Sequence, residues 1–154
     1  MDKIIRGSDN QSENIRRSED QIKYTPRHER LWVWQKAHQL RLIIHKICRT
    51  IPKDERFRLK DQIERSSNSV ADNLAEGNSS YYYNEKTKHF YIARREAAET
   101  QNHIRNLEGK LYINVKESHT LIYAYEEVIR GINGLIRRVK QKQDISRSKG
   151  SPKL

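Results

Sequence analysis

Turn-forming residues and cysteine are scarce in this chain. Its 154 residues include 6 Gly, 3 Pro and 1 Cys. All-β folds use many glycines and prolines in their turns, so this shortage argues against them and favours helices. The single Cys48 excludes a disulfide framework and a cysteine zinc site, and it suits a reducing compartment.

Long apolar runs are also missing. No stretch approaches the ~18 residues of a membrane-spanning helix. The start of the chain, Met1-Asp2-Lys3, lacks the apolar core of a secretory signal peptide. We therefore expect a cytoplasmic protein that does not associate with a membrane.

Positive charge, by contrast, is abundant. The net charge is +11 and the sequence pI is ≈ 9.8. Residues 140–154 alone carry five Lys/Arg against one Asp. Such an excess favours polyanionic partners, chiefly nucleic acid, because lysines and arginines that contact phosphates release counterions. Solubility alone is the alternative explanation.

Apolar residues recur at alternating three- and four-residue steps in four segments, the period of packed helices. The segments are marked by Val33, Ala37, Leu40, Ile44, Ile47 and Ile51; by Leu59, Ile63, Val70 and Leu74; by Phe90, Ala93, Ala97, Thr100, Ile104, Leu107 and Leu111; and by Ile122, Tyr125, Ile129, Ile132, Ile136 and Val139. Only short links separate them. The sequence therefore predicts an all-α fold, an antiparallel up-down four-helix bundle.

Polar residues next to these segments predict where the helices begin. Asp54 and Asn84 stand where they could cap the second and third helices, and Asn114 with Glu117 resembles a capping box for the fourth. Pro52 ends the first helix. We predict a disordered arm over residues 1–28, the bundle over 29–141 and a mobile basic tail over 142–154.

The second helix, predicted over residues 59–77, carries a polar stripe beside its apolar one. The stripe consists of Gln62, Ser66, Ser69, Asn73 and Glu76. Small, uncharged side chains let another helix approach closely and offer it hydrogen bonds. We interpret the stripe as a contact with a helix of the same chain or of a neighbouring subunit, the alternative being a solvated flank. In the fourth helix, Gly131 and Gly134 indicate either similar crowding or a mild kink.

Two groups of aromatic residues have two possible roles each. Trp32 and Trp34 could stack on nucleic-acid bases, but we favour packing anchors at the start of the first helix. Tyr81, Tyr82 and Tyr83 are adjacent, so they cannot all face the core. Either one packs inward and the others lie on a subunit contact, which we favour, or they stack on bases.

No residue pattern calls for catalysis or for a metal. The closest approach to the Glu-x-x-His pair of metal-binding bundles is Glu99 with His103, one residue too long. His38 and His45 share a face, but no acid stands at ligand spacing there. A phosphate-binding glycine loop and a recognisable nucleophile motif are missing too. We expect no cofactor, no metal and no enzymatic activity.

Residues 62–77, QIERSSNSVADNLAEG, resemble the signature of a four-helix-bundle family. The family comprises proteins encoded in intervening sequences of bacterial 23S ribosomal RNA genes and the accessory variability determinants of diversity-generating retroelements. The resemblance extends over about residues 31–140, with further agreement at 33–38, 90–93, 99–101 and 133–136. Ala71 departs from a usual Pro, Arg95-Glu96 from Gly-Ser, and Leu111 from a loop Gly.

The resemblance implies a homopentameric barrel of four-helix protomers with a basic surface. In the retroelement members such a barrel binds a reverse transcriptase and its template RNA. Our first hypothesis is therefore a non-enzymatic accessory protein that binds RNA or DNA and a reverse transcriptase. The alternative is a structural, self-assembling protein without a nucleic-acid role.

Cations gather near the end of the fourth helix, where they also suit the helix dipole. They are Arg130, Arg137, Arg138, Lys140 and Lys142. In a ring of subunits each cluster is repeated by symmetry, so modest patches act together on one phosphate backbone. We predict these five residues as the nucleic-acid-binding set.

Overall fold

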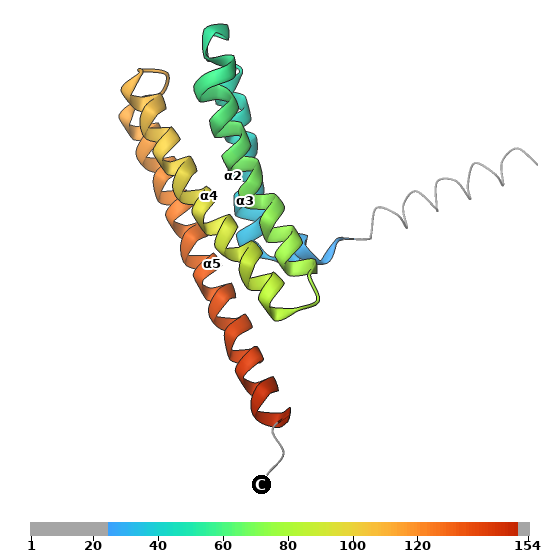
Figure 1. Cartoon of the computed structure of the whole chain (residues 1–154). Helices are drawn as coiled ribbons and strands as arrows, with labels where there is room; N and C mark the ends of the chain where they lie inside the picture. Colours follow the sequence, from blue (N-terminus) through green and yellow to red (C-terminus); the bar gives the residue numbers. More distant parts are fainter. Residues whose placement is uncertain (1–24, 151–154) are drawn as a thin grey trace, which may run out of the picture.

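The computed structural model describes residues 25–150, and within them every regular element is helical. The long helices are α2 (Trp32–Cys48), α3 (Asp61–Ser79), α4 (Tyr83–Gly109) and α5 (Val115–Gly150). Consecutive helices run in opposite directions, with α4 along both α3 and α5 (Figure 1). The predicted all-α, up-down four-helix bundle is confirmed. Of the disordered arm predicted over residues 1–28, residues 1–24 lie outside the described part of the chain. The prediction is wrong for Arg27 and His28, which belong to the 3-10 turn η1 (Arg27–Arg30).

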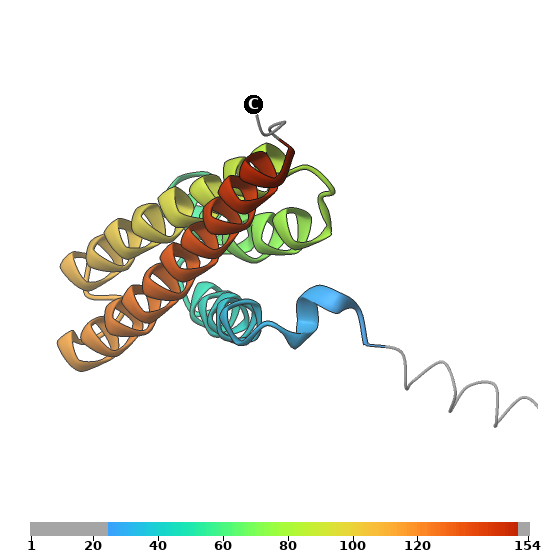
Figure 2. The same cartoon turned by 90° about the horizontal axis from the view of Figure 1, so that it is seen from below.

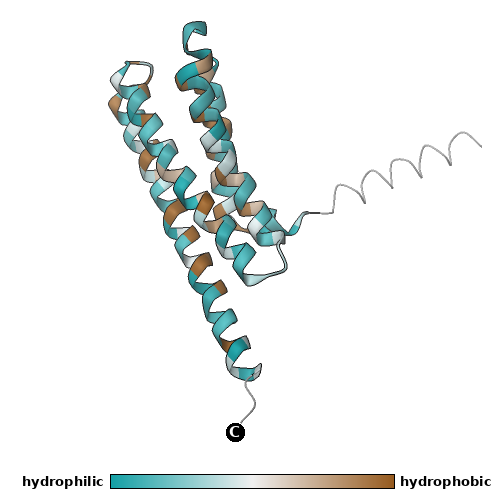
Figure 3. Cartoon of the chain, viewed as in Figure 1, coloured by the Kyte–Doolittle hydropathy of each residue, from teal (hydrophilic) through white to brown (hydrophobic). Residues whose placement is uncertain are grey.

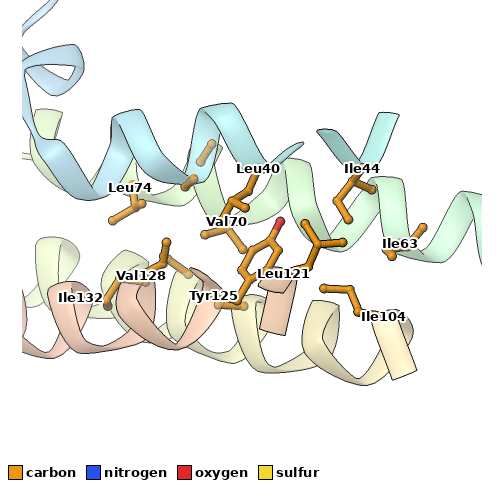
Figure 4. Close-up of a cluster of buried hydrophobic side chains, with 14 of the residues drawn as sticks. Leu40, Ile44, Ile63, Val70, Leu74, Ile104, Leu121, Tyr125, Val128 and Ile132 are labelled. Atoms are coloured by element: carbon orange, nitrogen blue, oxygen red, sulfur yellow. The ribbon is translucent and has the colours of Figure 1, made fainter. Parts of the chain in front are cut away.

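The core follows the apolar periods of the sequence. Ile44, Ile63, Ile104 and Ile132, one from each helix, are fully buried. In the close-up of Figure 4, Ile44, Ile63 and Ile104 lie toward one end of the buried cluster, and Ile132 lies toward the other end with Leu74 and Val128. Along each helix, hydrophobic residues recur among hydrophilic ones (Figure 3). Tyr125 is also fully buried, and burial raises the pKa of its hydroxyl.

The chain between the first two long helices differs from the prediction. Helix α2 ends at Cys48 rather than at Pro52, although Ile51 remains buried. A 3-10 turn, η2 (Lys53–Glu55), and a π-helical turn, η3 (Arg56–Lys60), then lead into α3. Arg58 kinks this segment with φ −117° and ψ −108°. The predicted cap at Asp54 is wrong, because the kink separates Asp54 from α3, whose first turn follows Lys60.

The predicted cap of the third helix is also wrong. Helix α4 begins two residues earlier, after Tyr82, whose extended backbone takes the N-cap position. Asn84 therefore lies inside the first turn, and its Oδ1 accepts a hydrogen bond from Gln143 Nε2 at 2.9 Å. This bond joins the start of α4 to the last part of α5.

Leu111 was predicted as the last core residue of the third helix, and this prediction is wrong. The side chain is 89% exposed, and the backbone is left-handed with φ 63°. The amide of Tyr112 donates to the Leu107 carbonyl and that of Leu111 to the Glu108 carbonyl, both at 2.9 Å. These two bonds form a Schellman motif, which places Leu111 where glycine is usual.

The start of α5 agrees with the sequence and its end does not. Asn114 Oδ1 accepts from the Glu117 amide at 2.8 Å, and Glu117 Oε2 accepts from the Asn114 amide at 2.9 Å, as a capping box requires. The helix continues to Gly150, through residues 142–150 that were assigned to the tail. No glycine or proline interrupts residues 135–149, so nothing in the backbone ends the helix sooner.

Gly131 lies where α2 crosses α5. A Cβ at Gly131 would stand 2.4 Å from Val33 Cγ2 and 2.8 Å from Trp32. Backbone crowding, one of the two explanations offered for the glycines, is therefore the reason at Gly131. At Gly134 the nearest atom would be 3.9 Å away, so crowding does not explain that glycine.

Candidate nucleic-acid interface

Three segments that are distant in the sequence meet at one end of the bundle. They are the 3-10 turn η1 (Arg27–Arg30), the α3–α4 link at residues 80–82 and the last third of α5. Figure 2 shows this end, with η1 and the last turns of α5 on either side of the link. Together they line a groove of ≈ 750 Å³, which we call the end groove.

Helix α2 holds η1 in position. The imidazole of His28 lies edge-on to the Trp34 ring, with 5.0 Å between centroids, and Trp34 stacks on His38 at 4.8 Å. Gln35 Nε2 donates a hydrogen bond of 2.8 Å to the carbonyl of Glu29. These contacts fix the turn that carries Arg27 and Arg30 to the groove.

The end groove is strongly basic. Its cations are Arg27, Arg30, Lys86, Arg138 and Lys142, and none of the lining residues among 25–150 is acidic. Burial, and then the neighbouring Arg27 and Lys142, lower the pKa of Lys86. Lys86 therefore stands close enough to Arg27 and Lys142 for their charges to repel its own.

Lys86 is held by the end of α3. Its Nζ donates to the carbonyl oxygens of Asn78 at 3.0 Å and of Gly77 at 3.3 Å. A cation at the C-terminus of a helix is favourable, since the last carbonyls lack intrahelical partners. These bonds place the ammonium group at the groove wall.

Of the three consecutive tyrosines, one side chain points toward the core and two point toward solvent. Tyr83 packs partly buried against the core. The side chains of Tyr81 and Tyr82 are 86% and 65% exposed. Their rings form an edge-to-face pair with 5.2 Å between centroids and an angle of 89°. Two aromatic rings thus stand at the mouth of a cationic groove.

The structure divides the five cations predicted at the end of α5. Arg138 and Lys142 line the end groove. Lys140 lies on another flank, where its Nζ donates to the Tyr91 hydroxyl at 2.8 Å. Arg130 lines a neighbouring groove with Trp32 and is 3.8 Å from Glu126. Arg137 is exposed.

Sequence reasoning missed Arg27, Arg30 and Lys86. Arg27 and Arg30 belong to a stretch of mixed charge without apolar period, so nothing marked them. Lys86 follows Tyr82 by four residues, a helical spacing that could have linked it to the tyrosines. The packing of η1 against α2 brings Arg27 and Arg30 to Arg138 and Lys142, whereas Lys86 reaches them through the packing of α4 against α5.

The polar stripe of α3 faces α4 of the same chain. Thr100 Oγ1 donates to Ser66 Oγ at 2.9 Å in the buried interior. Nearer the groove end, the imidazole of His89 lies 3.0 Å from Asn73 Oδ1 and 3.1 Å from Glu76 Oε2. The Asn73 amide donates to the Ser69 carbonyl at 2.9 Å. Gln62, the remaining member of the stripe, is exposed.

The cysteine Cys48 is buried in the core. Burial, reinforced by the Glu64 carboxylate, raises the pKa of the Cys48 thiol to about 12, so the thiolate is not available. In the part of the chain that the structure describes, no three His, Cys, Asp or Glu side chains are placed to hold a metal ion. No helix in residues 25–150 is both long and apolar enough to cross a membrane.

Comparison with known families settles the relationship. The family model described as 23S rRNA-intervening sequence protein matches residues 29–134. This chain belongs to that family. The 23S rRNA-intervening sequence match covers Arg30, the three tyrosines and Lys86, whereas Arg27, Arg138 and Lys142 lie outside it. The end groove thus combines residues of the family's bundle with residues that flank it.

A solved structure has the same fold. The crystal structure of a protein of unknown function from the S23 ribosomal protein family of Bacteroides thetaiotaomicron VPI-5482 is similar, with a TM-score of 0.63 at 21% sequence identity. The similarity covers 68% of this chain and 95% of the Bacteroides chain. The search of curated proteins gave no match. This 23S rRNA-intervening sequence protein thus shares its fold with the Bacteroides protein.

Proposed function

We propose that this protein is a non-catalytic, basic accessory protein that binds nucleic acid, with RNA as the ligand. The main support is the end groove, which combines Arg27, Arg30, Lys86, Arg138 and Lys142 with no acidic residue among its described lining. A phosphate backbone is the partner that relieves the mutual repulsion of these cations. The net charge of +11 strengthens the long-range attraction.

Assembly would multiply this binding. The family resemblance implies a homopentameric ring, and a ring presents the end groove once per subunit. An RNA that reaches two grooves gains from the second as an intramolecular contact, so the avidity exceeds that of a single groove. The same resemblance implies a reverse transcriptase as the protein partner. Sedimentation equilibrium should show a closed oligomer, and five chains are expected.

Charge reversal in the groove tests the proposal. Arg138→Glu with Lys142→Glu should weaken binding to a structured RNA and lower the slope of log K against log salt by about two units, one per lost phosphate contact. Lys46→Glu with Lys116→Glu is the matched control. It changes the net charge equally at exposed positions of the opposite end of the bundle, so its effect on the slope should be small.

Two results would overturn the proposal. One is an intact protein that binds RNA no better than an inert protein of matched charge at ~150 mM salt, where long-range attraction is screened. The other is an equal loss of affinity in both charge-reversed variants. The alternative, a self-assembling structural protein whose charge keeps it soluble, would then stand.

A further inference from the structure

We propose that the end groove holds an unpaired nucleic-acid strand, whose bases stack on Tyr81 and Tyr82 while its phosphates face the surrounding cations. This inference rests on the proposed function and adds to it the form of the nucleic acid. Proteins that bind single strands combine a cationic track with exposed aromatic rings in this way. The proposal assigns that role to residues from three segments.

The two outer tyrosines have surface to offer a ligand. They are 86% and 65% exposed, whereas the third tyrosine of the run is packed against the core. In an edge-to-face pair, the edge of one ring covers only one face of the other, so the remaining faces stay open to a base. The fold buries little of Tyr81 and Tyr82, and the exposed ring faces are therefore available for stacking.

The arrangement favours an unpaired strand over a duplex. In a duplex, neighbouring bases already cover one another's faces, and side chains on the protein surface meet mainly phosphates. A single strand can turn its bases toward the tyrosines and its phosphates toward the cations at the same time. Every base has a stacking face, so the groove should accept varied sequences and both RNA and DNA.

A subunit contact, the role favoured for these tyrosines from the sequence, fits the groove less well. A second copy of this chain carries the same net charge of +11. Its approach would bring more positive charge to a groove that has five cations and no acidic lining residue. Like charges at an interface oppose association, whereas a phosphate backbone is attracted to the same groove.

Probes with the same number of phosphates distinguish the contribution of base stacking to affinity from that of phosphate contacts. The full-length protein is titrated into fluorescent probes of one length: unpaired RNA, unpaired DNA of the same sequence, and a DNA strand in which every base is missing. A hairpin duplex is the fourth probe. We expect both base-bearing strands to bind about tenfold or more tightly than the abasic strand, since stacking adds that much per base. The duplex, whose bases already stack on one another, should lack the gain from stacking and bind less tightly than the base-bearing strands.

Substitution of the tyrosines locates the effect. Tyr81→Ala with Tyr82→Ala should remove the preference for bases and leave affinity for the abasic strand unchanged. Tyr81→Phe with Tyr82→Phe keeps both ring faces and should keep the preference. Tyr123→Ala is the matched control, because Tyr123 is 60% exposed on α5 and does not line the groove. Circular dichroism should show the same melting curve for all variants.

The possible failures can be told apart. If no probe binds better than to an inert protein of matched charge, the proposed function fails and this inference fails with it. Equal binding of abasic and base-bearing strands leaves the proposed function standing and overturns the stacking. A base preference that survives the double alanine substitution also overturns it. A change of oligomer size in that variant would assign the tyrosines to a subunit contact instead.

Discussion

The two ends of the bundle use their charges differently. At the end where α4 turns into α5, Glu55 Oε1 accepts hydrogen bonds from Lys110 Nζ at 2.5 Å and from the Tyr112 hydroxyl at 3.2 Å. Asn114 and Glu117 satisfy each other's amides beside it. We call this the paired end. The polar groups named here form hydrogen bonds with other groups of the same chain, at its turns and helix starts.

The groove end has the opposite balance. Arg27, Arg138 and Lys142 line it without an acid among the lining residues. Lys86 alone is bound to the backbone, at the end of α3. Charges that a chain pairs internally contribute to its own fold, whereas charges gathered without partners reduce stability by self-repulsion. This contrast supports the proposal that a polyanionic partner binds at the groove end.

The largest change in stability is expected at Gly131, where the start of α2 packs against α5 near the groove end. Gly131→Ala would bring a Cβ to 2.4 Å from Val33 Cγ2, and such overpacking costs about 1–3 kcal/mol. The gain in helix propensity, about 1 kcal/mol, is smaller. Urea unfolding should therefore show lower stability. RNA affinity should fall too, since η1 with its arginines is joined directly to the start of α2 and would shift with it.

Gly134→Ala is the matched control for this prediction. The nearest atom to the added Cβ would be 3.9 Å away, so only the propensity gain of up to about 1 kcal/mol remains. Its unfolding midpoint should rise. Equal changes in the unfolding midpoint of both variants would show that Gly131 is not crowded by Val33 and Trp32.

A gain of stability is expected at the paired end. Leu111 is in the left-handed conformation and 89% exposed, so its side chain contributes little packing. Leu111→Gly should raise the free energy of unfolding by about 1–2 kcal/mol, the usual penalty of a Cβ in this conformation. Leu111→Ala keeps a Cβ and should not share the gain. RNA affinity should be the same in all three proteins, because the change lies far from the groove.

A smaller loss is expected from the capping box at the same end. Asn114→Ala leaves the Glu117 amide without its side-chain acceptor, which costs about 1 kcal/mol. Asn114→Ser keeps an acceptor and should recover most of the loss. Thermal unfolding of the three proteins at equal concentration measures the difference. Indistinguishable midpoints would mean that water replaces the cap.

The apolar periods were enough to predict the helices and most of their buried faces. In α5, however, Leu121 and Val128 are buried, whereas the predicted Ile122 and Ile129 are only partly buried. Val33, Leu74 and Leu107 are buried as their spacing required. Helix ends were harder to place, because they depend on single backbone conformations. The kink at Arg58 and the left-handed Leu111 have no periodic signal. The Asn114 and Glu117 capping box was predictable because both partners are local in the sequence.

The candidate site was predictable only in part, for a related reason. Arg138 and Lys142 could be selected from charge density along one helix. Lys140 was selected with them, but lies on another flank, against Tyr91, because a helix turns successive residues to different sides. Arg27 and Arg30 join the groove through packing between distant segments. Sequence spacing does not encode that meeting.

The smallest effect expected is the pH dependence contributed by the paired end. The hydrogen bond from Lys110, and then that from Tyr112, lower the pKa of Glu55 below its usual range, outweighing its burial. A carboxyl group whose pKa is lower in the folded state stabilises the fold above its unfolded pKa of about 4.3. That contribution is lost as the pH falls through the folded pKa. Because the Lys110 side chain is 46% exposed, solvent screens the pair and keeps the contribution small.

Glu55→Gln isolates this contribution, since every other carboxylate is common to both proteins. The difference in unfolding free energy between wild type and variant should be largest near neutral pH and shrink as the pH falls below about 4. Urea unfolding across that range, at low and at high salt, measures it, and high salt should reduce the difference. A difference that is the same at neutral and acidic pH would show that Glu55 acts through shape alone. The paired end would then owe its stability to its caps and turns rather than to its charges.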